Sequence, residues 1–101
     1  MLFYLLLEPL ARNQPFNPVT IIKYEVPYLA GQKNQYPTSI AIYNIKGQLV
    51  RKLYNGFRGP GYYAAVWDGR GSQGRSLSSG LYICYLESGR FVKKIKMILA
   101  K

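Results

Sequence analysis

The chain has 101 residues, of which 49% are hydrophobic and 18% are charged, and its formal net charge is +10. This length suits one domain, and this composition is typical of a folded protein. The sequence has no histidine, one cysteine and four acidic residues. A catalytic triad with histidine and an internal disulfide are therefore excluded. The four acidic residues also offer few candidates for catalysis by a pair of carboxylates.

The first element is the apolar run LFYLLL, residues 2–7. No segment is long enough to span a bilayer, and this run lacks the positive flank and the cleavage site of a signal peptide. We expect residues 1–12 to form an apolar N-terminal segment, either as an extra strand or as the remnant of a preceding domain. Because an apolar terminus needs a surface that buries it, the run either pairs with the domain's own sheet or mediates self-association. The residues of the self-association hypothesis are Leu2, Phe3, Tyr4, Leu5, Leu6 and Leu7.

A proline-rich stretch and a strand pattern follow in NQPFNPVTIIKYEVP, residues 13–27. A residue that precedes proline favours extended geometry, so residues 15–18 are predicted to be stiff and polyproline-like. Such a segment can be a ligand for an aromatic groove. Because a strand pattern follows at once, the favoured interpretation is structural, with Phe16 packed on the end of the domain. The strand pattern covers residues 19–26 and places on one face Ile22, Tyr24 and Val26.

Five further segments alternate with period two and are separated by glycine and proline turn signals. We predict these strands at residues 38–44, 48–54, 62–68, 80–87 and 90–99. No stretch has the spacing of an amphipathic helix. The pattern predicts an all-β, immunoglobulin-like antiparallel β-sandwich of about seven strands, with residues 13–101 as the domain and residues 2–7 as a candidate seventh strand. Its predicted core residues are Phe16, Ile22, Tyr24, Ile40, Ile42, Trp67, Tyr82 and Met97.

Candidate catalytic and metal-binding residues are few. Asp68, which follows Trp67, suggests a calcium loop, but calcium takes about six to eight oxygen ligands and no second acid is nearby. The favoured interpretation is a core tryptophan followed by a turn in which the carboxylate accepts backbone N–H groups. The serines at 78 and 79 have no base partner, and Cys84 is predicted to be a buried, inert thiol. We therefore predict no enzyme, no catalytic residue, no cofactor and no metal site.

The last predicted strand is basic. Lys94 and Lys96 should point outward, on the opposite face from the apolar residues of that strand. Lysines on an edge strand block unwanted strand pairing, and this is the favoured interpretation. Basic residues beside exposed aromatic rings can instead bind phosphates and stack bases, which makes nucleic acid the least favoured partner. The aromatic candidates for such stacking are Tyr43, Tyr62 and Tyr85.

Four strings occur in order along the chain: NQPFNPVTIIKYEVP, IAIYNIKGQLVRKL, GPGYYAAVWDGRGSQGRSLSSGLYICYLESG and FVKKIKMILAK. Together they resemble the type A C-terminal sorting domain of proteins exported by the bacterial type IX secretion system, and the related immunoglobulin-like domain of the flagellar hook-capping protein. The matching elements fall on Asn17-Pro18, Tyr24–Pro27, Ile42–Val50, Trp67–Gly69, Ser79–Tyr82 and Lys93–Lys101. The chain departs from the family in its longer first loop, residues 30–37, and in Gly71–Gln73, which lacks carboxylates.

This resemblance implies a non-catalytic secretion and cell-surface module that docks to an outer-membrane export machinery. It implies an extracellular or bacterial cell-surface location. The implied partners are the secretion machinery or neighbouring protein subunits, with no small-molecule substrate. The residues that it assigns to sorting or recognition are Gly80, Tyr82, Lys93, Lys94, Lys96 and Lys101.

Two alternative functions remain open. In the first, the chain is a structural subunit of an extracellular assembly or filament, a homo-oligomer that uses its N-terminal apolar strand for subunit contacts. In the second, the net charge of +10 makes the domain a binder of polyanions or nucleic acid.

Overall fold

The protein is described by a computed structural model that defines residues 5–10, 19–28 and 35–100. These residues contain strands and turns but no helix. The strands are β1 (Leu5–Leu10), β2 (Val19–Val26), β3 (Tyr36–Asn44), β4 (Leu49–Arg58), β5 (Gly61–Trp67), β6 (Gly80–Ser88) and β7 (Phe91–Leu99). Nothing helical in the described part of the chain could cross a membrane.

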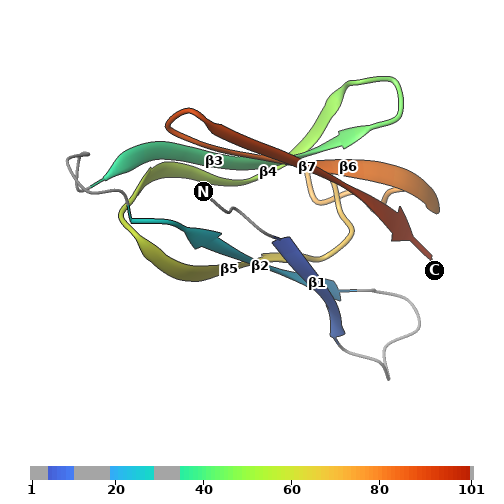
Figure 1. Cartoon of the computed structure of the whole chain (residues 1–101). Helices are drawn as coiled ribbons and strands as arrows, with labels where there is room; N and C mark the ends of the chain where they lie inside the picture. Colours follow the sequence, from blue (N-terminus) through green and yellow to red (C-terminus); the bar gives the residue numbers. More distant parts are fainter. Residues whose placement is uncertain (1–4, 11–18, 29–34, 101) are drawn as a thin grey trace.

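The strands form two antiparallel sheets that lie face to face (Figure 1). The smaller sheet has the order β1-β2-β5, and the larger sheet has the order β4-β3-β6-β7. The chain therefore crosses between the two layers after β2, after β4 and after β5, as chains do in immunoglobulin-like domains. The predicted all-β, immunoglobulin-like antiparallel sandwich is confirmed.

β1 lies at the edge of the smaller sheet. It pairs with β2 from Leu5 opposite Tyr24 to Leu10 opposite Val19. Part of the apolar N-terminal run is thus a strand of this domain's own sheet. Leu2, Phe3 and Tyr4 lie outside the described residues, and so does Phe16. The domain boundary after residue 12 and self-association through residues 2–7 stay predictions.

The core lies between the sheets and follows the period-two alternation of the strands. On β2, Ile22 and Tyr24 are 0% and 1% exposed, whereas Lys23 between them is exposed. The buried row of β2 packs with the buried rows of β3, β6 and β7. The buried cluster consists of Ile22, Tyr24, Val26, Tyr36, Ile40, Ile42, Trp67, Tyr82, Cys84, Leu86, Met97 and Leu99. It contains every predicted core residue that the structure describes.

The turn after β5 is a hydrogen-bonded corner. The Trp67 indole Nε1 donates to the carbonyl oxygen of Arg70 at 3.1 Å, and Asp68 Oδ1 accepts from the Arg70 N–H at 3.0 Å. The second partner of Asp68 was not predicted: Arg51 Nη1 on β4 lies 2.9 Å from Oδ1. The carboxylate therefore ties this turn to the larger sheet, which is a structural role.

Two strands are longer than predicted, at the same end of the sandwich. β3 begins at Tyr36, so the predicted loop 30–37 ends earlier, and β4 continues to Arg58 rather than to Tyr54. Tyr36 pairs with Arg58 across the two strands. The Arg58 guanidinium lies 4.0 Å from the ring centroid of Tyr54 and 4.4 Å from that of Tyr63. These cation–π contacts stabilise the extra length of β4, and sequence alternation does not reveal them.

Ile40→Ala should lower the free energy of unfolding by about 2–5 kcal/mol, because Ile40 is 0% exposed and truncation leaves a cavity between the sheets. Ile98→Ala is the control: Ile98 is 79% exposed, and the change should stay below about 0.5 kcal/mol. Urea unfolding followed by the fluorescence of Trp67 measures both values. Equal losses in the two variants would contradict the assigned core.

Cys84 should be unreactive in the native protein. It is 0% exposed, and burial raises the pKa of its thiol to about 12, so the reactive thiolate is scarce at neutral pH. Ellman's reagent at pH 8 should label the native chain at least about a hundredfold more slowly than the chain in urea. Ile98→Cys supplies an exposed thiol as a positive control. Prompt labelling of the native wild-type chain would show that Cys84 is accessible.

Candidate functional site

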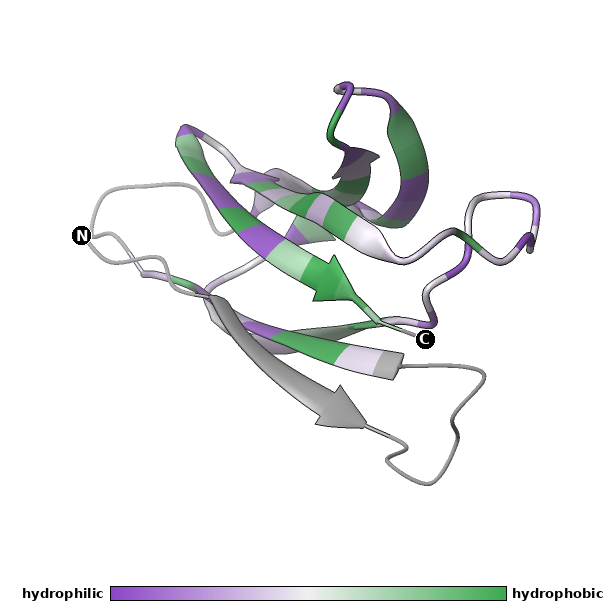
Figure 2. Ribbon diagram, turned by 90° about the vertical axis from the view of Figure 1, so that its right-hand side faces the viewer, coloured by the Kyte–Doolittle hydropathy of each residue, from purple (hydrophilic) through white to green (hydrophobic). Residues whose placement is uncertain are grey.

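The candidate site lies on the outer face of the larger sheet, which the smaller sheet does not cover. The alternation that buries one row of β6 turns Ile83 and Tyr85 outward. The register continues this outward row to β7, where Lys96 lies opposite Ile83 and Lys94 opposite Tyr85. On the other side, Tyr43 of β3 also lies opposite Ile83. Figure 2 shows hydrophobic and hydrophilic bands alternating along the strands of this sheet.

Two β-bulges shape this face. The pairing of β3 with β4 shifts register between Ile40 and Ala41 and again between Ile42 and Tyr43. Bulges bend a strand pair and increase its twist, and the β3–β4 hairpin rises away from the sheet (Figure 1). Beside the hairpin is a hollow of about 240 Å³. The residues that line it are Tyr43, Asn44, Ile45, Gly47, Ile83, Tyr85 and Lys94.

The tip of the hairpin is fixed by its own hydrogen bonds. Asn44 Oδ1 accepts from the backbone N–H groups of Lys46 at 2.9 Å and Gln48 at 3.0 Å. Gly47 has a φ of 82°, a left-handed conformation that glycine adopts without steric cost. This turn holds Ile45 at the rim of the hollow, where it is 69% exposed. The hollow is therefore already formed in the isolated domain.

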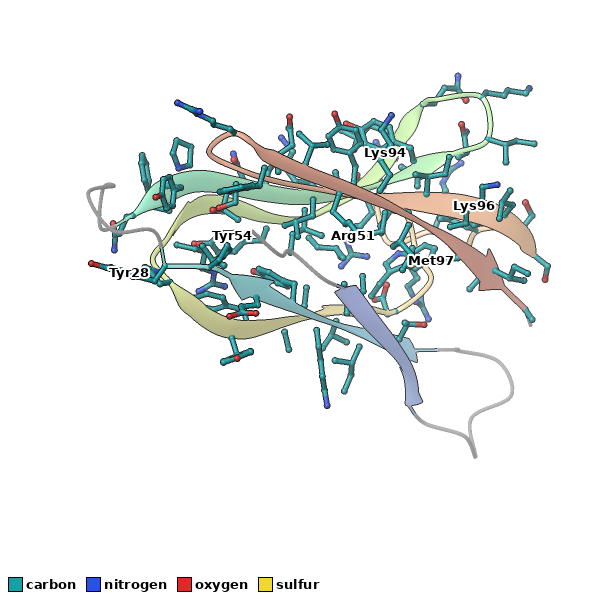
Figure 3. All side chains as sticks on the ribbon, viewed as in Figure 1. Tyr28, Arg51, Tyr54, Lys94, Lys96 and Met97 are labelled. Carbon is teal, nitrogen blue, oxygen red and sulfur yellow. The ribbon has the colours of Figure 1, made fainter. Side chains whose placement is uncertain are left out.

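Aromatic rings form part of the floor of the hollow. The rings of Tyr43 and Tyr85 meet edge-to-face, with centroids 6.1 Å apart and an interplanar angle of 69°. Lys94 Nζ lies 5.4 Å from the Tyr85 ring centroid, within the range of a cation–π contact. Figure 3 shows Lys94 and Lys96 on the outer side of the larger sheet, whereas Met97 points between the sheets.

Apolar side chains continue outward from the hollow. Ile98 is 79% exposed, Leu49 is 49% exposed, and Leu81 is 39% exposed. A second hollow of about 290 Å³ adjoins the first and is lined in part by Ile45 and Leu81. We use the name outer-face patch for the apolar and aromatic residues of this surface, which are Tyr43, Ile45, Leu49, Leu81, Ile83, Tyr85 and Ile98. Apolar side chains that cluster on a protein surface are typical of an interaction site.

Lysines surround the outer-face patch. Lys94 and Lys96 are exposed on its β7 side, Lys52 is exposed on β4, and Lys46 is exposed at the tip of the hairpin. Glu87 is the one acidic residue that the described strands place in the same outward rows. The patch therefore combines an apolar centre with a basic rim, which suits a partner that carries apolar and acidic side chains.

The structure separates the predicted recognition residues. It brings Lys94 and Lys96 together beside the outer-face patch, while Lys93 is exposed in the inward row of the same edge strand. Gly80 is exposed at the start of β6, and Lys101 lies outside the described residues. The lysines of β7 thus face two different sides of the strand.

Tyr82 lies in the core rather than on the surface. Its side chain is 6% exposed, and its hydroxyl donates to the carbonyl oxygen of Ser78 at 2.8 Å. Its ring meets Trp67 edge-on, with centroids 5.5 Å apart. These contacts hold the start of β6 against the corner after β5, so the Tyr82 side chain is not presented to a partner.

Sequence reasoning did not assign Ile45, Ile83 and Ile98 to a site, and it noted Tyr43 and Tyr85 only as exposed aromatic residues. The sequence did contain a signal that two of these residues are exposed. Ile45 is an apolar residue in an otherwise polar turn, and Ile98 stands in the row that the alternation assigns to solvent. What the sequence did not reveal is that Ile45, Ile83 and the two tyrosines line one hollow beside the bulged β3–β4 hairpin.

The described residues contain no group of three or more histidine, cysteine, aspartate or glutamate side chains that could hold a metal ion. Asp68, which was weighed as a calcium ligand, is paired with Arg51 instead.

Comparison with known proteins addresses the region that carries this face. A family model for the FlgD Ig-like domain matches residues 28–90, which is more than half of the chain. A search of curated proteins found no match, and a search of solved structures found none either. The family match confirms the relation to the immunoglobulin-like domain of the flagellar hook-capping protein, while the type IX sorting relation stays a prediction. The chain belongs to the FlgD Ig-like domain family.

Proposed function

We propose that this domain is a non-catalytic protein-binding module of an extracellular or cell-surface assembly, and that it docks to its protein partner through the outer-face patch. The observation that carries the proposal is the preformed hollow with its exposed apolar rim and surrounding lysines. Family membership supports a non-catalytic role within a protein assembly.

The patch has the composition of a binding hot spot. Aromatic residues at the centre of an interface and apolar residues around them provide most of the binding free energy. An apolar side chain of the partner would fill the hollow beside Tyr43 and Tyr85 and exclude water from Ile45. The lysines would pair with acidic residues of the partner, which favours fast association and orients the two surfaces.

A more specific form of this proposal is the sorting role in type IX secretion. Its support is the order of the sequence motifs and the exposure of Lys94 and Lys96 on the last strand. In that form the partner of the outer-face patch is a component of the outer-membrane export machinery, and the domain reaches the bacterial cell surface.

Nucleic acid fits this face less well than protein does. Base stacking requires an open aromatic ring face. Lys94 lies over the ring of Tyr85, and this ring also meets the ring of Tyr43 edge-to-face. The most exposed side chain of the patch is the aliphatic Ile98, which contributes no stacking.

Photo-crosslinking in the native host tests the proposal. A benzophenone amino acid in place of Ile98 should capture one discrete protein, whereas the same probe in place of Tyr28 should not. Tyr28 is 71% exposed, and Figure 3 places it at the opposite end of the sandwich from Lys96. Equal capture from both positions, or none from position 98, would refute docking through this patch.

Ile45→Asp should reduce capture from position 98 by at least about tenfold, because it places a carboxylate at the rim of the apolar hollow. Tyr28→Asp is the matched control and should leave capture unchanged. Both positions are strongly exposed, so neither substitution should affect folding, which urea unfolding verifies.

A further inference from the structure

β5 is the second edge strand of the smaller sheet, opposite β1, and it pairs only with β2 among the described strands. Its sequence, GYYAAVW, has no charged residue and no proline. Its register with β2 runs without a shift from Thr20 opposite Trp67 to Val26 opposite Gly61. A regular, apolar and uncharged edge is a template for the addition of another strand.

The other sheet edges carry features that oppose strand addition. β7 has Lys93, Lys94 and Lys96, and β1 contains Glu8 and Pro9. β4 has two register shifts, and its Val50 carbonyl oxygen already accepts from the backbone N–H and the hydroxyl of Ser72. Among the described strands, β5 alone lacks a charge, a proline and a bulge.

We propose that two copies of this chain pair through β5, antiparallel, about a two-fold axis at Ala64. The two smaller sheets then join into one continuous sheet. In this register Ala64 of one copy lies opposite Ala64 of the other, and Tyr62 lies opposite Val66. On the inward face, Tyr63 lies opposite Ala65.

The side chains of β5 suit this self-pairing. Tyr62 and Val66 are 74% and 54% exposed, and pairing would place each beside the other as an aromatic and β-branched cross-strand pair. The small side chain of Ala64 lies on the two-fold axis between the two β5 strands. Each tyrosine thus faces a smaller residue, and no position sets two large side chains against each other.

The charge distribution favours a second copy at this edge. The chain has a net charge of +10, so copies repel one another wherever lysines face each other. On the strand that pairs with β5, the charged residue opposite Ala64 is Lys23. Three strand spacings would separate the two Lys23 residues, about 14 Å, which exceeds the screening length in physiological salt.

Disulfide trapping tests the pairing. Ala64→Cys should give a disulfide-linked dimer on mild oxidation, because residues on the axis of an antiparallel pair have Cα atoms about 4.5–5.5 Å apart, within disulfide range. Cys84 is buried and gives no background. Ile98→Cys, on the outer face of the larger sheet, is the matched control and should give far less dimer. Equal dimer from both variants, or none from Ala64→Cys, would overturn the proposal.

Sedimentation equilibrium gives an independent test on reduced protein. The wild-type chain should show a concentration-dependent dimer, which Ala64→Lys abolishes because two ammonium groups meet on the axis. Ile98→Lys adds the same charge elsewhere and should retain the dimer. A wild-type chain that is monomeric at every concentration, or an Ala64→Lys dimer, would refute self-pairing. Capture of a partner by the outer-face patch would survive either result, since the two surfaces lie on different sheets.

Discussion

Apolar contact between two rows of side chains holds this domain together. The described strands of one sheet form no ladder with those of the other, and the single cysteine excludes an internal disulfide. The sheets are therefore joined mainly by the packing of Ile22 and Tyr24 against the buried rows of β3 and β6. Because only every second side chain of a strand points inward, the core uses one row of each strand. The alternate row is left available for contacts with other molecules.

The two bulges in the β3–β4 pair allow the core and the hollow to exist side by side. β3 lies between β4 and β6, so its inward residues, Ile40 and Ile42, must stay in the core. Each bulge places the extra residue on β4, whose outer edge pairs with no other strand that the structure describes. The bend is thus absorbed on the edge strand. The hairpin moves outward while the core row remains in place, and this opens the hollow above Tyr43.

The sequence was informative where structure is local. Period-two alternation gave β2 its observed bounds, and it assigned Tyr82 and Cys84 to the inward row of β6. It missed side-chain contacts between the two sheets, such as those of Arg51 with Asp68 and of Arg58 with Tyr63. It missed the candidate site for the same reason, since three separate strands, β3, β6 and β7, contribute to the lining of the hollow, and the bulges lie in the pairing of β3 with β4.

The placement of lysine decides which edges of this sandwich are available to other chains. On β7, lysines oppose strand addition and at the same time form the rim of the outer-face patch. On β5, their absence leaves an edge open. If two chains join through β5 with equivalent faces aligned, the two-fold axis stands perpendicular to the joined sheet. Both larger sheets then cover the same side of that sheet, and both outer-face patches face the same direction. Such a pair would engage two sites on a repetitive surface at once, where linkage of two weak contacts raises the overall affinity without any new contact.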